Sequence, residues 1–342
     1  MKILTVRLMA IPFLLVCLAS SRSDAQDSFY KGKTVRIIVG ASAGGGYDTY
    51  SRTIARHIGK HIPGNPTFVV DNMPGAGMLI AANHVYKVAK PDGLTIGHFI
   101  GGLFLQQFLG KPGIEFDAAK FEYIGVPTLD NYVIGVSKKT TGITSMDQWF
   151  SSKTVVKLGG VGAGSATDDI PKVLMATIGL PAQLVSGYKG TADIRLAYNS
   201  GEVQGVNNSW QSFEATWPNE LKSGDLQIVL QTTAKSHPDL AKVPLAISYA
   251  KTEEARNLIR ALVHSVGPAA RPYVLPPGTP KERLSLLRKA FMDVMKDPEL
   301  LADAKKAKLD INPLDGQELE QNVKDIFKLD PALVPKAKEI LR

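Results

Sequence analysis

Short apolar runs alternate with helical patterns along the first hundred residues of the chain. Thr34–Val39 is rich in β-branched residues and ends in the glycine-rich stretch Gly40–Gly46. Isoleucines then recur four residues apart from Ile54 to Ile62, the spacing of one helix face, until Pro63–Gly64 ends the pattern. Strands that alternate with helices in this way predict βαβ units and a largely parallel sheet.

The same alternation starts again in the second third of the chain. A second glycine-rich loop, Gly159–Thr167, follows one predicted strand and precedes a predicted helix, Asp168–Ile178. Further strands are predicted at Thr67–Val70, Leu94–Phe99, Tyr132–Val136, Val155–Leu158, Gln183–Val185, Val203–Val206 and Gln227–Leu230. The chain therefore contains two α/β units.

The last third of the chain is predicted to be mainly helical. Arg271–Gly278 is a proline-rich break, and the helices expected after it are Lys281–Met295, Pro298–Lys306 and Gln317–Phe327. Amphipathic helices need a sheet to cover, so we expect this tail to return to the first unit. The predicted fold is α/β with two lobes, each a mainly parallel sheet flanked by helices. Residues 26–127 and 268–342 form lobe 1, residues 128–267 form lobe 2, and two crossovers join them.

The first 25 residues have the pattern of a secretory signal peptide. Lys2 and Arg7 precede an apolar stretch, Leu8–Ala19, which is too short to span a bilayer, and Ser23–Ala25 offers small residues for cleavage. An uncleaved anchor and lipidation of Cys17 are the alternatives. Cleavage after residue 25 predicts a soluble mature protein in the periplasm.

Composition narrows the possible functions. The 342 residues are 44% hydrophobic and 21% charged, which is typical of a folded chain of about two domains. The single cysteine excludes a disulfide framework, a four-thiolate zinc site and an iron–sulfur cluster. The formal charge of +8 is moderate, and nucleic-acid binding would require that charge on one face. We expect no nucleic-acid partner.

Known catalytic and cofactor motifs are missing from the sequence. His57 and His61 are four residues apart, but no HExxH motif completes a metal site, and no G-x-S-x-G elbow is present. Gly160–Gly164 loosely matches a dinucleotide fingerprint, yet Ile170–Ala192 contains no acidic residue to bind a ribose. We therefore expect no metal and no cofactor.

The two glycine-rich loops carry the candidate chemistry. Each follows a strand and opens a helix, where unpaired backbone N–H groups and the helix dipole favour anions. Two such helix N-termini facing each other across a cleft would hold a carboxylate without any arginine, with the hydroxyls of Ser42, Ser165 and Thr167 as further donors. Asp48 either orients loop amides or caps its own helix. The alternative is that the glycines only make tight turns.

In this order, the motifs resemble those of the substrate-binding proteins of tripartite tricarboxylate transporters, the Bug or TctC-like family. The matching segments are Gly32–Val39, Gly44–Asp48, Ser51–Arg52, Asn72–Gly77, Pro91–Gly93, Gly162–Ser165, Tyr188–Gly190, Gly201–Val203 and Pro276–Pro280. The resemblance implies a type II-like periplasmic binding protein of two lobes, a monomer. It would close on a small organic carboxylate and deliver it transiently to integral membrane subunits of the transporter.

The resemblance also implies a binding site made by both loops. Carried over residue by residue, the ligand-binding residues are Ser42, Ala43, Gly44, Gly45, Gly46, Tyr47, Asp48, Gly164, Ser165, Ala166, Thr167 and Asp168. Relatives usually place a histidine where this chain has Asp168, and a smaller residue where it has Tyr47. Asp168 caps its helix, recognises a ligand hydroxyl or amine, or stays protonated beside the acid. The identity of the carboxylate is therefore left open.

A second function class remains possible on the same fold. A periplasmic enzyme acting on a small organic acid could use Asp48 or Asp168 as a base. No second acid, histidine or metal set stands beside either aspartate in the sequence, so the expectation is a receptor and not an enzyme.

Overall fold

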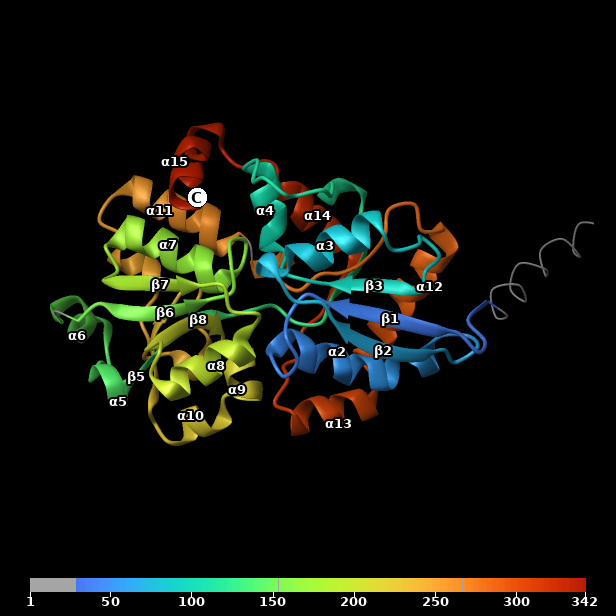
Figure 1. Ribbon diagram of the computed structural model, residues 1–342, viewed down its shortest axis with the longest axis horizontal. Coiled ribbons are helices and arrows are strands. Elements are labelled where there is room, and N and C mark those ends of the chain that lie inside the picture. The colour runs from blue at the N-terminus through green and yellow to red at the C-terminus, as the bar shows by residue number, and fades with distance from the viewer. Residues whose placement is uncertain (1–28, 153, 266) are drawn as a thin grey trace, which may run out of the picture.

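Two β-sheets lie side by side along the length of the molecule and are flanked by helices (Figure 1). The computed structural model describes residues 29–342, except residues 153 and 266. The predicted signal peptide, residues 1–25, lies outside the described residues. The two-lobed α/β architecture expected from the sequence is confirmed.

The first sheet has six strands in the order β11-β4-β10-β3-β1-β2. The pairs β1–β2 and β1–β3 are parallel, whereas β10 and β11 pair antiparallel with the strands beside them. The strands are β1 (Thr34–Val39), β2 (Thr67–Asn72), β3 (Thr95–His98), β4 (Glu122–Val126), β10 (Tyr273–Leu275) and β11 (Leu314–Asp315).

The second sheet has five strands in the order β7-β6-β8-β5-β9. β6 runs parallel to β7 and β8, and β5 runs antiparallel to β8 and β9. The strands are β5 (Tyr132–Ser137), β6 (Val156–Gly160), β7 (Ala182–Ser186), β8 (Gly205–Ser209) and β9 (Leu226–Gln231).

Both sheets are mixed, which corrects the expectation of mainly parallel sheets. The strands that enter a sheet directly from the other lobe, β5 and β10, are antiparallel to their neighbours. A crossover helix between neighbouring strands imposes a parallel pair, and neither of these two strands follows one. β10 has three residues between Pro272 and Pro276, too few to give a strand pattern in the sequence.

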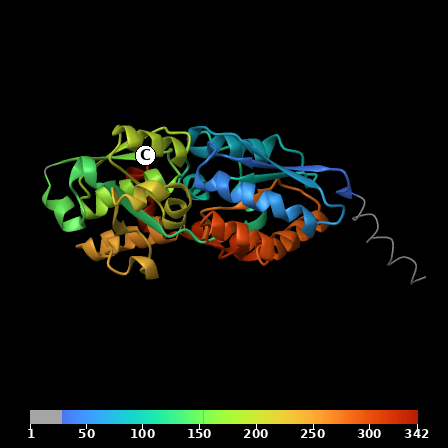
Figure 2. The ribbon, with the colours of Figure 1, turned by 90° about the horizontal axis from the view of Figure 1, so that it is seen from below.

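Helices from both ends of the chain cover the first sheet. α12 and α14 pack on β4, and α13 packs on α2, so the tail returns to the first sheet as the sequence predicts. In Figure 2 the tail helices, red and orange, lie along the same lobe as the blue N-terminal elements. The helices of this lobe are α2 (Gly46–His57), α3 (Leu79–Lys87), α4 (Gly102–Phe108), α12 (Lys281–Val294), α13 (Pro298–Lys306) and α14 (Gly316–Ile326).

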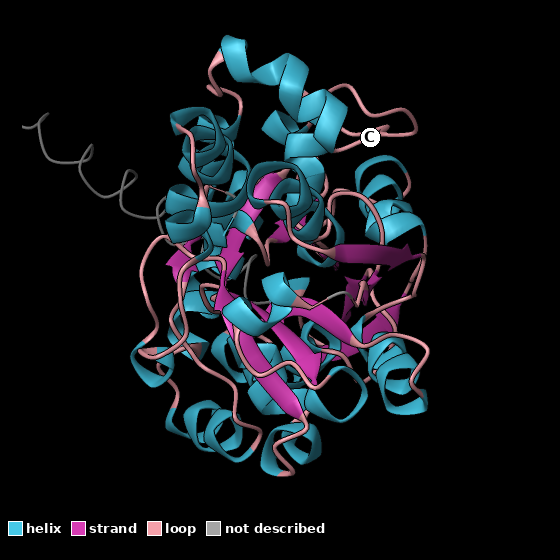
Figure 3. Ribbon diagram, turned by 90° about the vertical axis from the view of Figure 1, so that its left-hand side faces the viewer, coloured by secondary structure: helices cyan, strands magenta, loops and turns pink. Residues whose placement is uncertain are grey.

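Short helices surround the second sheet, whose strands lie inside the lobe (Figure 3). α11 continues into a π-helical turn at Arg260–His264. The helices are α5 (Lys138–Thr141), α6 (Met146–Ser151), α7 (Ala166–Ile178), α8 (Thr191–Ser200), α9 (Trp210–Thr216), α10 (Pro218–Lys222) and α11 (Glu253–Ile259).

The last helix, α15 (Val334–Ile340), lies on the second lobe although it follows the tail of the first. It packs against α7, and Lys172 Nζ donates a hydrogen bond of 2.7 Å to the carbonyl of Arg342 (Figure 1). The proposed boundaries place residues 268–342 in lobe 1, and this helix departs from that division. It gives the two lobes a third connection beside the two crossovers.

Candidate functional site

Both glycine-rich loops reach one cavity between the lobes. The cavity measures about 30 Å³, enough for only a few waters, so an organic acid can enter only when the lobes part. From the first sheet's side it is lined by Ala41, Gly46, Tyr47, Met78 and Ile100, from the second sheet's side by Tyr132, Val161, Ser165, Ala166, Thr167, Thr191 and Asn208, and from the crossovers by Asp130 and Arg271.

The first loop brings the N-terminus of α2 to the cavity. Gly46 is the first residue of that helix, and the N–H groups of a first turn have no partner within the helix. A Cβ at Gly46 would overlap Ser212 Oγ and lie 3.3 Å from Arg271 Nη1, so only glycine permits this approach of the helix. Tyr47 also lines the cavity, and its hydroxyl donates to the carbonyl of Ala270 at 2.8 Å.

Asp48 faces the loop that precedes it and does not line the cavity. Its Oδ2 accepts hydrogen bonds from the Gly44 amide and from Arg52 Nε, both at 2.9 Å, and its Oδ1 accepts one from Asn72 at 3.0 Å. Burial raises the pKa of Asp48, but these donors more than offset burial and hold the pKa below its usual value. Of the two roles considered for Asp48, the structure shows the orientation of a loop amide.

The rest of the first loop makes contacts with the second lobe or faces solvent. Ser42 Oγ donates to Asp193 of α8 at 2.5 Å, and the Ser42 amide donates to the carbonyl of Lys189 at 3.1 Å. Ala43 and Gly44 are exposed, and Gly45 is the N-cap residue of α2. Ser42 therefore joins the two lobes, and none of these four residues lines the cavity.

The second loop lines the cavity with Ser165, Ala166 and Thr167. Gly164 does not line it, and its amide donates to Asp169 Oδ2 at 3.0 Å. The Val161 amide donates to Thr167 Oγ1 at 2.9 Å. The loop is therefore folded around its own side chains.

Asp168, in the first turn of α7, accepts most of the hydrogen bonds that the second loop donates, and it is not among the residues that line the cavity. Its carboxylate accepts hydrogen bonds from the Gly162 amide at 2.7 Å, from Ser165 Oγ at 2.9 Å, from Thr167 Oγ1 at 3.0 Å and from Ser186 Oγ. Asp168 does not cap its helix, as the first of the three roles has it, because α7 begins at Ala166 with Ser165 as the N-cap residue and no side-chain cap hydrogen bond. Its carboxylate is instead turned to donors of the preceding loop and of Ser186. Ser165 Oγ also lies 2.6 Å from Thr167 Oγ1, so its single proton is engaged within the loop.

The charged group at the cavity is one that the sequence analysis missed. Arg271 is 1% exposed, and its Nε donates to Asp130 Oδ1 at 2.7 Å. Its Nη2 donates to Ser209 Oγ at 3.0 Å and to Ser212 Oγ at 2.7 Å, whereas Nη1 has no hydrogen-bond partner among the described residues. The sequence predicts a carboxylate site that needs no arginine, whereas the structure places a buried guanidinium in the cavity lining with one nitrogen unpaired.

Asp130 stabilises the charged form of Arg271, and the ion pair joins the two crossover segments. Burial disfavours the charged guanidinium, but the Asp130 carboxylate more than offsets burial and holds the pKa of Arg271 above its usual value. Asp130 lies in the crossover between β4 and β5, and Arg271 lies in the crossover that enters β10. The ion pair therefore links the two crossovers beside the cavity.

Aromatic rings and a second unpaired donor complete the surroundings of Arg271. The guanidinium carbon lies 4.6 Å from the ring centre of Tyr47 and 5.0 Å from that of Tyr50, which are cation–π distances. The Tyr132 hydroxyl donates to Asp130 at 3.0 Å. Asn208 Nδ2 is buried without a hydrogen-bond partner among the described residues. Both unpaired groups of the cavity lining are donors, which suits a ligand that accepts hydrogen bonds.

A buried carboxyl behind the second loop bridges the two lobes. Asp169 Oδ2 accepts a hydrogen bond of 2.8 Å from Gln106 of α4, and its Oδ1 has no partner among the described residues. Burial is the main cause that raises the pKa of Asp169 to about 6. The contact joins the first turn of α7 to the other lobe.

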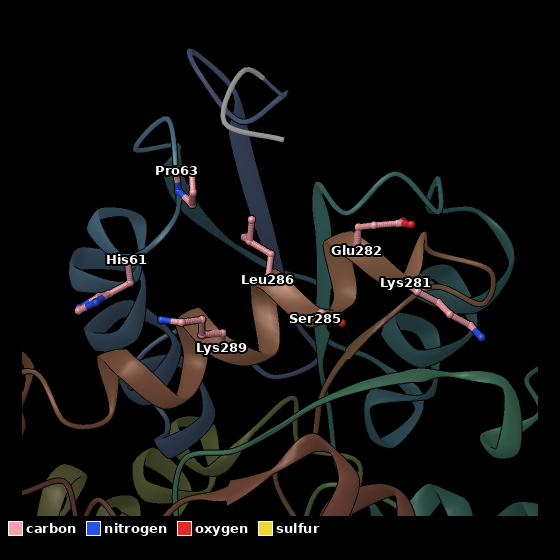
Figure 4. Close-up of a pocket in the computed structure, with 7 residues that line it drawn as sticks. All are labelled: His61, Pro63, Lys281, Glu282, Ser285, Leu286 and Lys289. Carbon is pink, nitrogen blue, oxygen red and sulfur yellow. The ribbon is translucent and has the colours of Figure 1, made fainter. Parts of the chain in front are cut away.

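A larger hollow lies elsewhere and has a different character. It measures about 630 Å³ and lies between α12 and the turn Ile58–His61 that follows α2 (Figure 4). In the close-up, Lys281 and Glu282 point away from His61, so its charged side chains do not converge on one point. His61 Nε2 is paired with Asp297 at 2.7 Å, and His57 Nε2 with Asp303 at 2.9 Å. We take the interlobe cavity as the candidate site.

The described part of the chain contains neither a cluster of metal-binding side chains nor a membrane-spanning helix. No group of three or more His, Cys, Asp or Glu side chains there is placed to hold a metal ion. No helix within residues 29–342 is long and apolar enough to cross a membrane.

Known proteins resemble the chain along most of its length. A UPF0065 protein of Bordetella bronchiseptica is 24% identical over 302 residues, which is 83% of this chain and 80% of that protein. A second UPF0065 protein, from Cupriavidus necator, is 24% identical over 93% of this chain and 92% of its own length.

Solved structures share the fold. The periplasmic binding protein BugD superposes with a TM-score of 0.71 at 21% identity, covering 91% of this chain and 97% of that one. MatC from Rhodopseudomonas palustris, with bound malate, gives a TM-score of 0.69 at 18% identity, covering 91% and 99%. An adipate-bound protein of the same species gives 0.71 at 20% identity, covering 90% and 97%.

The sequence profile described as "Tripartite tricarboxylate transporter family receptor" matches residues 51–338, which include the second loop, both crossovers and the helical tail. The chain belongs to the tripartite tricarboxylate transporter receptor family.

Proposed function

We propose that this protein is a periplasmic receptor that binds a small organic carboxylate between its lobes and delivers it to the integral membrane subunits of a tripartite transporter. One observation carries the proposal: a buried guanidinium with an unpaired Nη1 lines the interlobe cavity at the N-terminus of α2. A buried unpaired donor on a charged group is costly, and a carboxylate oxygen is its natural partner.

In the proposed complex the carboxylate lies between Arg271 and the first turn of α2. The free amides of that turn and the positive end of the helix dipole add to the charge of the guanidinium. Asn208 Nδ2 supplies a further donor from the second lobe. Gly46, Tyr47, Ser165, Ala166 and Thr167 contact the ligand, and the other seven residues carried over from the family position the loops or hold the lobes together.

Closure follows from the distribution of these donors. α2 belongs to the first lobe and Asn208 to the second, so the ligand makes all of its contacts only when the lobes meet. The contacts of Ser42 with Asp193 and of Gln106 with Asp169 add to the closed state without the ligand. The ligand therefore shifts an equilibrium between open and closed forms.

The location and partners are proposed from the family and the sequence. The neighbour BugD is described as a periplasmic binding protein, and the N-terminal pattern of this chain is that of a cleaved signal peptide. We propose a monomer that meets its membrane subunits transiently. The carboxylates of malate and adipate, bound by two structural neighbours, support the class of ligand.

The enzyme alternative has less support in the geometry. Asp48, one of the two bases considered, is paired with Arg52, and Asp168, the other, accepts hydrogen bonds from an amide and three hydroxyls. A general base needs a lone pair directed at the substrate proton, and neither carboxylate lines the cavity.

Thermal unfolding with a carboxylate panel tests the proposal. A ligand present at about 100 times its Kd adds about 2.7 kcal/mol to the free energy of unfolding, so a binder gives a clear shift. Arg271→Gln should abolish the shift, and Lys90→Gln, the loss of an exposed cation remote from the cavity, should leave it unchanged. Shifts with nucleotides and none with carboxylates would overturn the proposal, and turnover seen by mass spectrometry would favour the enzyme.

A further inference from the structure

The cavity contains a single cation, and this limits the charge of the ligand. Of the residues that line it, only Arg271 and Asp130 are charged, and they form an ion pair with side chains 2% and 1% exposed. Arg271 uses Nε for Asp130 and keeps Nη1 for the ligand. One ligand carboxylate therefore has a charged partner, and no second cation lines the cavity for another.

The second loop opposes a further negative charge. Asp168 lies directly behind the lining residues Ser165 and Thr167, whose hydroxyls donate to it. Asp169 follows in the same turn of α7. Neither carboxylate forms an ion pair with a lysine or arginine of the described chain, and Lys111 and Lys172 act on them only at longer range. A ligand carboxylate buried at this end of the cavity would therefore meet like charges with no cation in direct contact.

The remaining wall is mainly apolar, with Thr191 as a further polar residue beside Asn208. Ala41, Met78, Ile100, Val161 and Ala166 line the cavity with carbon atoms. The polar tips of the two lining tyrosines are already used, since the Tyr47 hydroxyl donates to a backbone carbonyl and the Tyr132 hydroxyl to Asp130. The rings therefore offer their carbon surfaces to the ligand, and Asn208 Nδ2 is left for a neutral acceptor or the second carboxylate oxygen.

We infer that the ligand is a monocarboxylate with an uncharged, largely apolar body, and that the cavity rejects dicarboxylates and tricarboxylates. This inference rests on the proposed function, because it concerns the same cavity and assigns the ligand carboxylate to Arg271. It separates this chain from the structural neighbours described with malate and adipate, whose ligands carry two carboxylates.

Matched ligands that differ by one charge test the inference on the purified mature protein by isothermal titration calorimetry at neutral pH. Hexanoate, adipate and monomethyl adipate share a carbon chain, and the ester removes one charge of adipate while keeping its length. Benzoate and terephthalate form the same comparison for a ring. We expect the monoanions to bind at least about tenfold more tightly than the dianions, because the second carboxylate would be buried without a partner.

The outcomes separate the inference from the proposed function. Dianions that bind as tightly as their monoanionic partners, or more tightly, overturn the inference, and if Arg271→Gln then removes that binding the receptor function stands. If no carboxylate of either series binds the wild type, both fail. If the monoanions bind and Arg271→Gln leaves their Kd unchanged while Lys90→Gln behaves as the wild type, the carboxylate is held elsewhere and the assignment to Arg271 is wrong.

Discussion

The two glycine-rich loops occupy equivalent places in the two lobes, yet only in the first does an arginine pair with the carboxylate of the first helical turn. At α2 the acidic residue of the first turn, Asp48, is neutralised by Arg52, and Arg271 Nη1 lies close to Gly46. At α7 the acidic residues Asp168 and Asp169 turn inward, accept loop amides and have no cation partner within the described chain. The first loop therefore favours an anion. In the second loop, the carboxylates of Asp168 and Asp169 accept the hydrogen bonds that the loop donates.

A strand, a glycine-rich loop and a helix are therefore not sufficient to make an anion site. Whether such a motif binds an anion depends on where the nearby carboxylates lie and on whether a cation neutralises them. The same motif lies beside the Arg271 guanidinium in one lobe and folds around the Asp168 carboxylate in the other.

Among the variants, we expect the largest loss of stability and binding from substitution of Arg271, the cation that lies beside the first loop. Arg271→Gln should lower the free energy of unfolding by about 3–5 kcal/mol, because Asp130 is left buried without its partner. Adding Asp130→Asn should restore most of that stability but not carboxylate binding. Chemical denaturation and calorimetry separate the two effects, and binding by the double variant would contradict the assignment of Arg271 to the ligand.

Glycine substitutions should affect the two loops differently. In Gly46→Ala the new Cβ overlaps Ser212 of the other lobe, so closure is hindered and we expect carboxylate affinity to fall at least about tenfold. In Gly160→Ala the Cβ overlaps the Asp168 carboxylate, so we expect a loss of about 1–3 kcal/mol of stability and a smaller change in affinity. Equal effects of both variants on affinity would remove the distinction between the loops.

Ser165→Ala tests whether the second loop donates to the ligand. Because the Ser165 hydroxyl donates to Asp168, its loss should reduce the free energy of unfolding by about 1.5–3 kcal/mol, the contribution of a hydrogen bond to a charged group. We expect affinity to change by less than about threefold. A tenfold loss of affinity with unchanged stability would instead support the direct donor role that the sequence predicts for the Ser165 hydroxyl.

Asp169 gives the second loop a pH dependence opposite in sign to that of Asp48 in the first, whose pKa is lowered. Its pKa is raised to about 6, so its protonated form stabilises the fold at low pH, and that stability is lost as pH rises through this value. Asp169→Asn keeps an acceptor for Gly164 and Gln106 and removes the charge. The variant's free energy of unfolding, relative to wild type, should therefore increase by up to about 1 kcal/mol between acidic and neutral pH. A difference independent of pH would contradict the role of the charge.

The sequence predicted the regular elements well where the pattern was strong. The bounds of β1 and α13 agree with the predicted ranges, and both glycine-rich loops lie where strands end and helices begin. β10 was missed because three residues between prolines give no period, and the sheets were expected to be parallel because strands and helices alternate. Side-chain orientation at Asp168 and Ser165 depends on contacts within the loop that spacing does not encode.

The pairing of Arg271 with Asp130 could have been predicted from the sequence, because each is an isolated charge in an otherwise uncharged segment. Between Arg260 and Lys281, Arg271 is the one residue among Lys, Arg, Asp and Glu. Between Glu122 and Lys138, Asp130 is likewise the one such residue. Each crossover thus carries a single charge within an apolar segment, and the two charges have opposite signs. Buried charges are seldom found unpaired, so two such segments joining the same lobes predict an ion pair between them.

The position of β10 has a consequence for how the protein is made. This strand lies between β3 and β4 in the middle of the first sheet, but it follows the whole second lobe along the chain. During synthesis the N-terminal half therefore has no complete sheet to fold into until nearly all of the second lobe has been translated. Pairings so distant in sequence form late and slowly. The first sheet is therefore completed only after the chain has returned from the second lobe.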